Sequence, residues 1–328
     1  MRRSAVGSWT HQAPGASAHV AGQGDQAMAS QRPRASIVLV AWTILLALSL
    51  LPVVAIQEVL GGTVTADLRA GGSVAVIAVA LAMTLAWAPM RVLRPFLWLF
   101  LVLVSAHWVV FTQVGRLPII QGWLNDPSFG VYMPAELALN LVVTLAVIAM
   151  LWFVMRDRRA FYLATGDLSA PAEPIPWLGV KPGHGWNKTG RDLAIFISLG
   201  TLTFLVLAGR PSIDIAVQVL GFLPVVLVAA ALNAFNEEVT YKASFLSVLL
   251  VPVGSRHALW MVAAYFGIAH FYGVPYGVIG VGLASFLGWI LAKSMLDTRG
   301  LAWAWFIHFW QDVLIFGFMA AGAIRPGG

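Results

Sequence analysis

The sequence predicts an all-α fold, a polytopic membrane helix bundle of eight to ten transmembrane helices around a polar intramembrane cavity. Of the 328 residues, 59% are hydrophobic and only 10% are charged, against about 25% in soluble domains. Apolar runs long enough to cross a bilayer recur along most of the chain. Ionisable residues inside such runs are rare in the first half of the chain and gather in its last third. Together these observations exclude an ordinary soluble domain.

Four regions follow from the distribution of apolar runs. Residues 1–35 are polar and rich in small residues, and we expect a flexible N-terminal arm. Four spans form an N-terminal membrane region at 36–155. A proline-containing loop at 156–192 separates it from a second membrane domain at 193–323. The candidate spans are 36–56, 71–89, 95–111, 135–155, 193–208, 213–232, 239–253, 258–272, 274–292 and 301–323.

Basic residues predict the orientation. Arg91 and Arg94 follow the second candidate span, and Arg156, Arg158 and Arg159 follow the fourth. If the basic N-terminal arm is cytoplasmic, all these positions return to the cytoplasm, as the positive-inside rule requires. We therefore expect a multi-pass protein of the cell (plasma) membrane with a cytoplasmic N-terminus and a cytoplasmic loop at 156–192. The net charge of +6 is explained by these loops, and no nucleic-acid partner is expected.

Six ionisable residues, two of them histidines, mark the last third of the chain. They are Glu237, Glu238, Lys242, His270, His308 and, four residues later, Asp312. A charged side chain at mid-membrane costs about 2.5–3.5 kcal/mol by insertion scales. If all the carboxylates and the lysine faced lipid, the sum would approach a whole protein's stability. These side chains must therefore face one another or a water-containing cavity.

Helical spacing groups these residues in pairs. Glu238 and Lys242 lie four positions apart on one helical face, in the better order for an ion pair. Glu237 points about 100° away from Glu238, which leaves it free for the cavity. His308 and Asp312 also share a face. A carboxylate, imidazoles and hydrogen-bond donors are the groups that activate water and stabilise an oxyanion.

Three short motifs resemble those of the type II CAAX prenyl endopeptidase family, also called the CAAX-protease and bacteriocin-processing (CPBP) family. The run from Glu237 to Lys242 is similar to the EExxxR motif. The run from Phe266 to His270 is similar to FxxxH, and the run from His308 to Asp312 is similar to HxxxN or HxxxD. The resemblance covers roughly residues 195–323, so that 193–323 is expected to be a CAAX-protease-like catalytic membrane domain. Residues 1–190 are not covered.

The resemblance implies an intramembrane endopeptidase, a hydrolase that acts on a peptide or membrane-protein substrate in the lipid bilayer. By the family's pattern, Glu237 and His270 activate the attacking water, and His308 and Asp312 bind the oxyanion. The residues also leave metal binding open: Glu237, His270 and His308 are possible zinc ligands of a metalloprotease, or they do metal-free acid–base work. The chain has no cysteine, so cysteine-ligated zinc is excluded.

Supporting roles and two departures follow from the same resemblance. Glu238 and Lys242 are expected to orient the first catalytic helix, and Phe266 supports the site. Lys242 stands where the family usually has arginine, so the charge is kept but a bidentate contact is lost. Asp312 stands where asparagine is frequent. An ionised Asp312 would repel an oxyanion, whereas a protonated one could donate to it; alternatively Asp312 orients His308.

Other interpretations stay open at this point. Glu237 and Glu238 are also compatible with a simple helix start, where acidic residues favour the helix dipole. Lys242 alone could snorkel to the membrane surface, and His308 could belong to an aromatic belt. The alternative functions are a non-catalytic membrane scaffold or immunity-type factor that keeps the fold, and a proton- or ion-coupled transporter that uses the same cavity.

Overall fold

The computed structural model describes residues 34–322, apart from the side chains of residues 213–216 and 218. Over this part of the chain the fold is all-α, as predicted, with two isolated β-bridges and no strand. Most of the expected arm at 1–35 lies outside the described residues. The long helices are α2 (Ala35–Leu48), α4 (Ala66–Ala86), α5 (Arg94–His107), α7 (Phe129–Met155), α8 (Trp186–Gly209), α9 (Ile213–Glu237), α10 (Ser244–Ala269), α11 (Val278–Thr298) and α12 (Ala302–Ala320).

Shorter elements extend or join these helices. Two π-helical segments prolong the first spans, η1 (Ala55–Val59) after α3 (Leu51–Val54) and η3 (Trp108–Gln113) after α5. A third, η6 (Glu238–Ala243), lies between α9 and α10. The remaining short segments are η2 (Ala88–Leu93), η4 (Val114–Arg116), α6 (Pro118–Leu124) and η5 (Pro176–Leu178).

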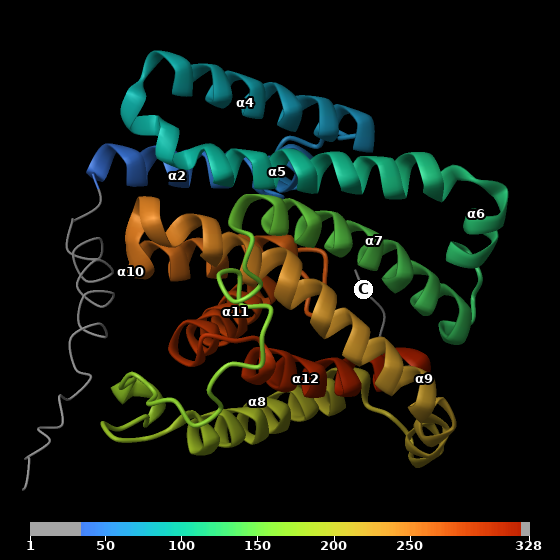
Figure 1. Ribbon diagram of the computed structural model, residues 1–328. Helices are drawn as coiled ribbons and strands as arrows, with labels where there is room; N and C mark the ends of the chain where they lie inside the picture. The colour runs from blue at the N-terminus through green and yellow to red at the C-terminus, as the bar shows by residue number, and fades with distance from the viewer. Residues whose placement is uncertain (1–33, 323–328) are drawn as a thin grey trace, which may run out of the picture.

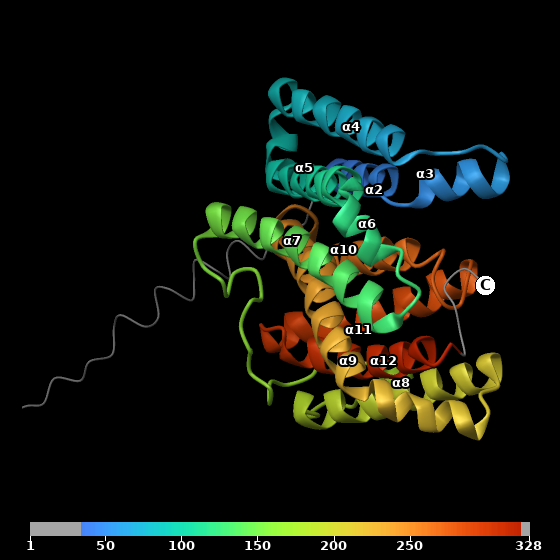
Figure 2. The same cartoon turned by 90° about the vertical axis from the view of Figure 1, so that its right-hand side faces the viewer.

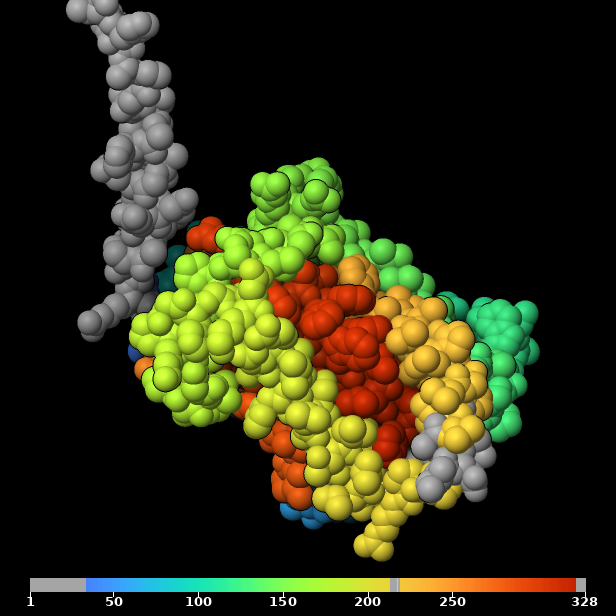
Figure 3. Space-filling view, turned by 90° about the horizontal axis from the view of Figure 1, so that it is seen from below, coloured from blue at the N-terminus to red at the C-terminus, as the bar shows by residue number. Residues whose placement is uncertain are grey.

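The helices stack in layers. Figures 1 and 2 show α4 outermost, then α2 and α5, with α7 and α10 beneath them and α8, α9, α11 and α12 on the far side. Viewed from that far side, α12 forms the red surface that is framed by α8 and α9 (Figure 3). The elements that carry the three motifs therefore pack together, with the N-terminal membrane region on top of them.

Aromatic residues join the N-terminal membrane region to the second half. The rings of Phe96 and Phe100 on α5 pack edge-on against Phe245 on α10, with centroids 6.1 and 5.2 Å away. Tyr265 lies 5.6 Å from Phe100 and stacks on Phe245 at 4.6 Å. Aromatic pairs of this geometry contribute about 0.5–1.5 kcal/mol each beyond the area that they bury. The two halves therefore share one core.

Fewer candidate spans are found among the described residues than the sequence predicts. Among the described residues, six helical stretches are long and apolar enough to cross a membrane, or up to seven if the bent pair α2 and α3–η1 is one span. The expected eight to ten are not confirmed. One reason is that α12 is not among these stretches, because His308, Gln311 and Asp312 lower its mean hydropathy. These findings nevertheless describe a multi-pass integral membrane protein.

A second reason is that two expected spans form one helical stretch. The candidates 239–253 and 258–272 lie in η6 and α10, which continue α9, and residues 219–269 qualify as a single apolar stretch of 51 residues. The break that the sequence suggested is present as a kink: Pro252 lies inside α10, and Gly254 has the non-helical backbone angles φ 76° and ψ 162°. Proline removes one backbone donor and glycine tolerates a positive φ, so two helical segments meet at a bend there.

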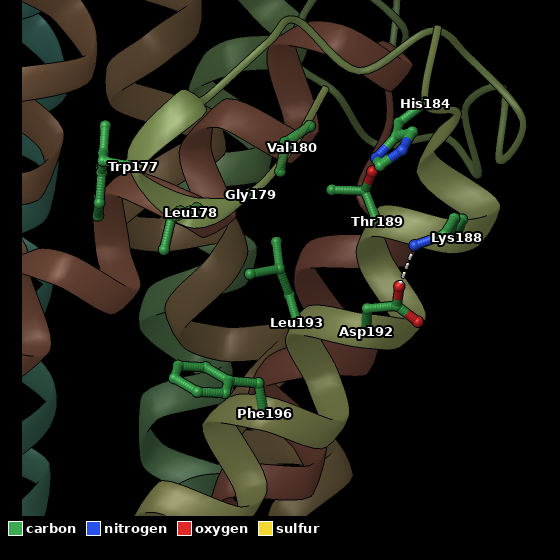
Figure 4. Close-up of a pocket in the computed structure, with 10 residues that line it drawn as sticks. All are labelled: Trp177, Leu178, Gly179, Val180, His184, Lys188, Thr189, Asp192, Leu193 and Phe196. Atoms are coloured by element: carbon green, nitrogen blue, oxygen red, sulfur yellow. Dashed lines mark hydrogen bonds and ion pairs between the residues drawn. The ribbon is translucent and has the colours of Figure 1, made fainter. Parts of the chain in front are cut away.

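The long loop is ordered and packs against the last helices. The α8 helix begins at Trp186 rather than near the predicted 193. The indole of Trp186 donates to Asp297 at 3.0 Å, and the buried Lys293 bridges Asp297 and Glu173. Between the loop and α8 lies a cavity of about 300 Å³, with Lys188 paired to Asp192 at its rim (Figure 4). This loop fastens α8 to α11 and so frames the far side of the bundle.

A prediction concerns the contact between this loop and the turn before α12. A Cβ atom on Gly300 would lie 2.3 Å from the backbone nitrogen of Gly166, which itself has φ +79°. Backbone atoms cannot rotate away, so we expect Gly300→Ala to lower the free energy of unfolding by about 1–3 kcal/mol. Thermal unfolding in detergent measures this. Gly200→Ala on α8, where a Cβ would meet nothing within 4 Å, is the control and should unfold at the wild-type temperature or above. Equal losses in both variants would contradict the prediction.

Candidate active site

The first motif lies where a regular helix passes into a π-helical turn. The α9 helix ends at Glu237, and η6 begins with Glu238. The neighbouring Asn236 anchors this point to α7: it donates to the carbonyl oxygen of Leu137 and accepts from the Thr144 hydroxyl, each at 3.0 Å. Single π-helical turns are often found at functional sites. Here α7 of the N-terminal membrane region fixes the position of the turn, and the side chains of the two glutamates point in different directions.

Glu238 and Lys242 form a fully buried ion pair. Their Oε1 and Nζ atoms are 2.7 Å apart, and both side chains are 0% exposed. The ammonium also lies over the ring of Phe266, 3.3 Å from the ring centroid, so a cation–π contact supports it. Lys242 therefore does not reach a membrane surface. Its compact charge occupies a closed position, bounded by a carboxylate and an aromatic face, where the family usually has arginine.

Glu237 is left out of this pair and faces both histidines. Its Oε2 atom lies 3.5 Å from Nε2 of His308 and 4.0 Å from Nε2 of His270. This oxygen is buried and has no hydrogen-bond partner among the described residues. A separation of 4.0 Å is too long for a direct hydrogen bond but suits one bridging water. Glu237 thus offers a free acceptor between two imidazoles.

His270 follows directly after α10 and is held by the helix itself. Its Nδ1 atom lies 2.8 Å from the carbonyl oxygen of Phe266, and its ring is 4.3 Å from the Phe266 ring. Because a carbonyl only accepts, Nδ1 carries the proton and Nε2 is left as the acceptor on the side of Glu237. The side chain is 36% exposed, more than the other members of the cluster. His270 therefore marks the open side of the site.

His308 is oriented by carboxylates on both sides of its ring. Its Nδ1 atom donates to Oε1 of Glu238 at 2.6 Å, and its Nε2 atom lies 3.6 Å from Oδ1 of Asp312. Asp312 is itself held by Asn233, whose amide donates to Oδ2 at 3.1 Å. We did not anticipate Asn233 from the sequence. It lies four residues before Glu237, so one helical turn on α9 was the signal that could have found it.

The structure brings every predicted site residue into one cluster. Glu237 and Glu238 come from the α9–η6 junction, His270 from the end of α10, and His308 and Asp312 from α12. The predicted supporting side chains, Lys242 and Phe266, lie behind them. His308 is buried at 5% exposure, which argues against its placement in an aromatic belt at the membrane surface.

Metal binding, which the sequence left open, gains no support from the arrangement of the described residues. In the described part of the chain, no group of three or more His, Asp or Glu side chains is arranged to hold a metal ion. Glu237, His270 and His308 lie near one another, and both imidazoles are held through Nδ1, by the carbonyl of Phe266 and the carboxylate of Glu238. The zinc expectation receives no support from this geometry.

Comparison with known proteins matches the segment that carries this cluster. No curated protein and no solved structure matches the chain significantly. A family model does match residues 219–314, and its description is Type II CAAX prenyl endopeptidase Rce1-like. All the cluster residues lie inside the matched segment, whereas the N-terminal membrane region lies outside it. The resemblance drawn from the three motifs is thereby confirmed: residues 219–314 are similar to the Rce1-like type II CAAX prenyl endopeptidases.

Proposed function

We propose that the chain is an intramembrane endopeptidase that hydrolyses a peptide bond with water activated by Glu237 and His270. The family match supports membrane-protease chemistry in general. One observation carries the finer proposal: the buried Oε2 of Glu237 has no described hydrogen-bond partner and lies between two imidazole nitrogens. A general base needs such a free acceptor within reach of a water molecule.

The proposed reaction proceeds by acid–base steps. A water molecule donates one hydrogen bond to Oε2 of Glu237 and one to Nε2 of His270. Glu237 takes a proton as the water oxygen attacks the carbonyl carbon of the substrate. The tetrahedral intermediate then breaks its C–N bond, and the proton on Glu237 passes to the leaving amine nitrogen. The products are a carboxylic acid and an amine, and Glu237 returns to its carboxylate form.

We assign the oxyanion to His308. Its Nδ1 proton is fixed by Glu238, so a donor at Nε2 requires a second proton on the ring. The charge around it favours that form, because the carboxylates of Glu237, Glu238 and Asp312 face only one lysine, Lys242. Asp312, held by Asn233, is then a positioning residue that keeps Nε2 of His308 directed into the site.

The substrate is a peptide segment that enters from the bilayer. The partly exposed His270 is the side from which a chain can approach, while Glu238 and Lys242 are closed off. The departures at Lys242 and Asp312 favour the alternative of a non-catalytic scaffold. The Asn233–Asp312 contact weakens that alternative, since it gives the carboxylate a defined place next to His308.

Terminal proteomics tests the proposal in cells. We expect that cells producing the wild-type chain contain membrane-peptide termini that disappear when Glu237→Ala is produced at the same level. The matched control is Glu136→Ala: Glu136 lies on α7, is exposed and forms no ion pair with a described residue, so its variant should keep the same termini. Identical termini in all three strains would refute the protease proposal. A proton-driven flux lost in Glu237→Ala would instead favour the transporter.

We also propose a plasma-membrane location with a cytoplasmic N-terminus. The arginines after α4 and α7 support this orientation, because those helices return the chain to the side of the arm. The chain has no native cysteine, so single cysteines can be labelled in intact cells. An impermeant thiol reagent should label Ser128→Cys, before α7, and should spare Ser169→Cys, in the long loop. The reverse pattern would overturn the orientation.

A further inference from the structure

A second cavity lies between the N-terminal membrane region and the catalytic turn. It has a volume of about 550 Å³, within the range of small-molecule pockets. The ends of α2 and α5 and the start of α4 form one wall. Tyr241 of η6, together with Tyr265 and Ala269 of α10, forms the other. Figures 1 and 2 show these helices as adjacent layers. The cavity is separate from the cluster around Glu237, but Tyr241 borders it.

One unpaired positive charge lies in this cavity. Arg69 is the single Lys, Arg, Asp or Glu among the described residues that line it. Its guanidinium forms no hydrogen bond or ion pair with another described residue. The nearest acid along the helix, Asp67, is engaged elsewhere: it accepts from the Trp108 indole at 2.8 Å and pairs with Arg116 at 3.5 Å. Arg69 is exposed on the cavity side of α4, and the other polar lining residues, among them Ser73, His107 and Tyr265, are uncharged or histidine, so its charge is available to an anion.

The surroundings favour an anion that carries hydrocarbon. Leu103, Val104 and Phe111 are among the mostly apolar lining residues. The α4 helix that carries Arg69 is peripheral: only 17% of its spanning segment is buried inside the bundle, against 44% for α11. Most of α4 therefore faces the acyl chains. Arg69 lies in the first turns of α4, near the end of the span where lipid headgroups are found.

We propose that this cavity binds an anionic membrane phospholipid, whose headgroup phosphate pairs with Arg69 while part of an acyl chain lies along Leu103, Val104 and Phe111. The charge of Arg69 recognises the headgroup, and the apolar wall contacts the acyl chain. A guanidinium binds phosphate through two parallel N–H donors. The free hydroxyls of Ser73 and Tyr265 supply further donors on the same lining.

The bound lipid contacts the catalytic turn directly. Tyr241 precedes Lys242, and its hydroxyl lies 3.3 Å from Nε2 of His107 on α5. Ala269 precedes His270. The lipid site thus gives the N-terminal membrane region, which the family model does not match, a binding role next to the site. Lipid binding in this cavity does not depend on proteolysis, so the experiment measures the amount of bound lipid.

Native mass spectrometry of the protein in neutral detergent tests lipid binding. The probes are dioleoylphosphatidylglycerol and dioleoylphosphatidylcholine at equal concentration. We expect the wild type to retain one copy of the anionic lipid with about fivefold preference, the effect of one basic residue near a lipid surface. Arg69→Gln should lose that preference. Ala70→Leu, which fills the cavity, should lower retention of the lipid, and the exposed loop variant Arg158→Gln should match the wild type.

Three results would overturn the proposal. One is equal retention of both lipids by the wild type. Another is an unchanged preference in Arg69→Gln when its thermal unfolding matches that of the wild type. The third is Arg69-dependent binding of a peptide with a free C-terminal carboxylate, but not of its amide, without any effect on lipid retention; the cavity would then belong to the peptide. Loss of protease activity in any variant bears on the proposed function and leaves these binding results unaffected.

Discussion

Replacing Glu237 by glutamine should lower the rate of peptide-bond cleavage about 10²–10⁴-fold, the contribution of a positioned general base. Glutamine keeps the shape of the side chain but has no carboxylate to accept a proton from water. The affected Oε2 atom has no hydrogen-bond partner among the described residues, so the change breaks no hydrogen bond made by that atom. We therefore expect the unfolding temperature to stay near that of the wild type. The measurement is kcat for a reporter peptide in proteoliposomes.

Two controls separate chemistry from structure in that experiment. Glu136→Gln makes the same change on α7, away from the cluster, and should cleave at the wild-type rate. Glu238→Gln should also be slow, but for a different reason: it weakens the 2.6 Å contact with Nδ1 of His308 and the pair with Lys242, so it should lower the unfolding temperature as well. A Glu237→Gln enzyme as fast as the wild type would remove Glu237 from the chemistry.

The local geometry of the site could be predicted from helical spacing. The positions of Glu238 and Lys242, four apart, predicted a shared face, and the structure places their charged atoms 2.7 Å apart. The same spacing of His308 and Asp312 gives a separation of 3.6 Å. Such pairs depend on the geometry of one helix alone, and sequence carries that geometry directly. The π-helical turn changes the pitch at Glu238 without separating the pair.

Contacts between distant helices could not be predicted in the same way. The hydrogen bond of Thr144 with Asn236 spans 92 residues, and the contact of His107 with Tyr241 spans 134. Apolar composition shows that helices pack but not which faces meet, since lipid and protein interior are equally apolar. For the same reason the boundaries of the expected eight to ten spans differ from the six or seven apolar helical stretches that the described residues form. A kink at Gly254 and a true span boundary look alike in a run of apolar residues.

The second large effect is expected at Lys242. Lys242→Met should lower the free energy of unfolding by about 3–5 kcal/mol, the usual result when one partner of a buried ion pair is removed. Both side chains are 0% exposed, so neither water nor headgroups can compensate the remaining carboxylate of Glu238. Methionine keeps most of the volume beside the Phe266 ring but loses the cation–π contact. The midpoint of unfolding in a denaturing detergent series measures the change.

Removing both charges should undo much of that loss. In the double variant Glu238→Gln, Lys242→Met, no uncompensated carboxylate remains, and an amide oxygen can still accept from Nδ1 of His308. The double variant should therefore be more stable than Lys242→Met alone, and the coupling free energy from the full cycle measures the pair. Simple additivity of the two single losses would show that the pair contributes little. If stability is recovered while cleavage stays slow, the negative charge of Glu238 is needed for the reaction itself, because it favours the doubly protonated form of His308 that binds the oxyanion.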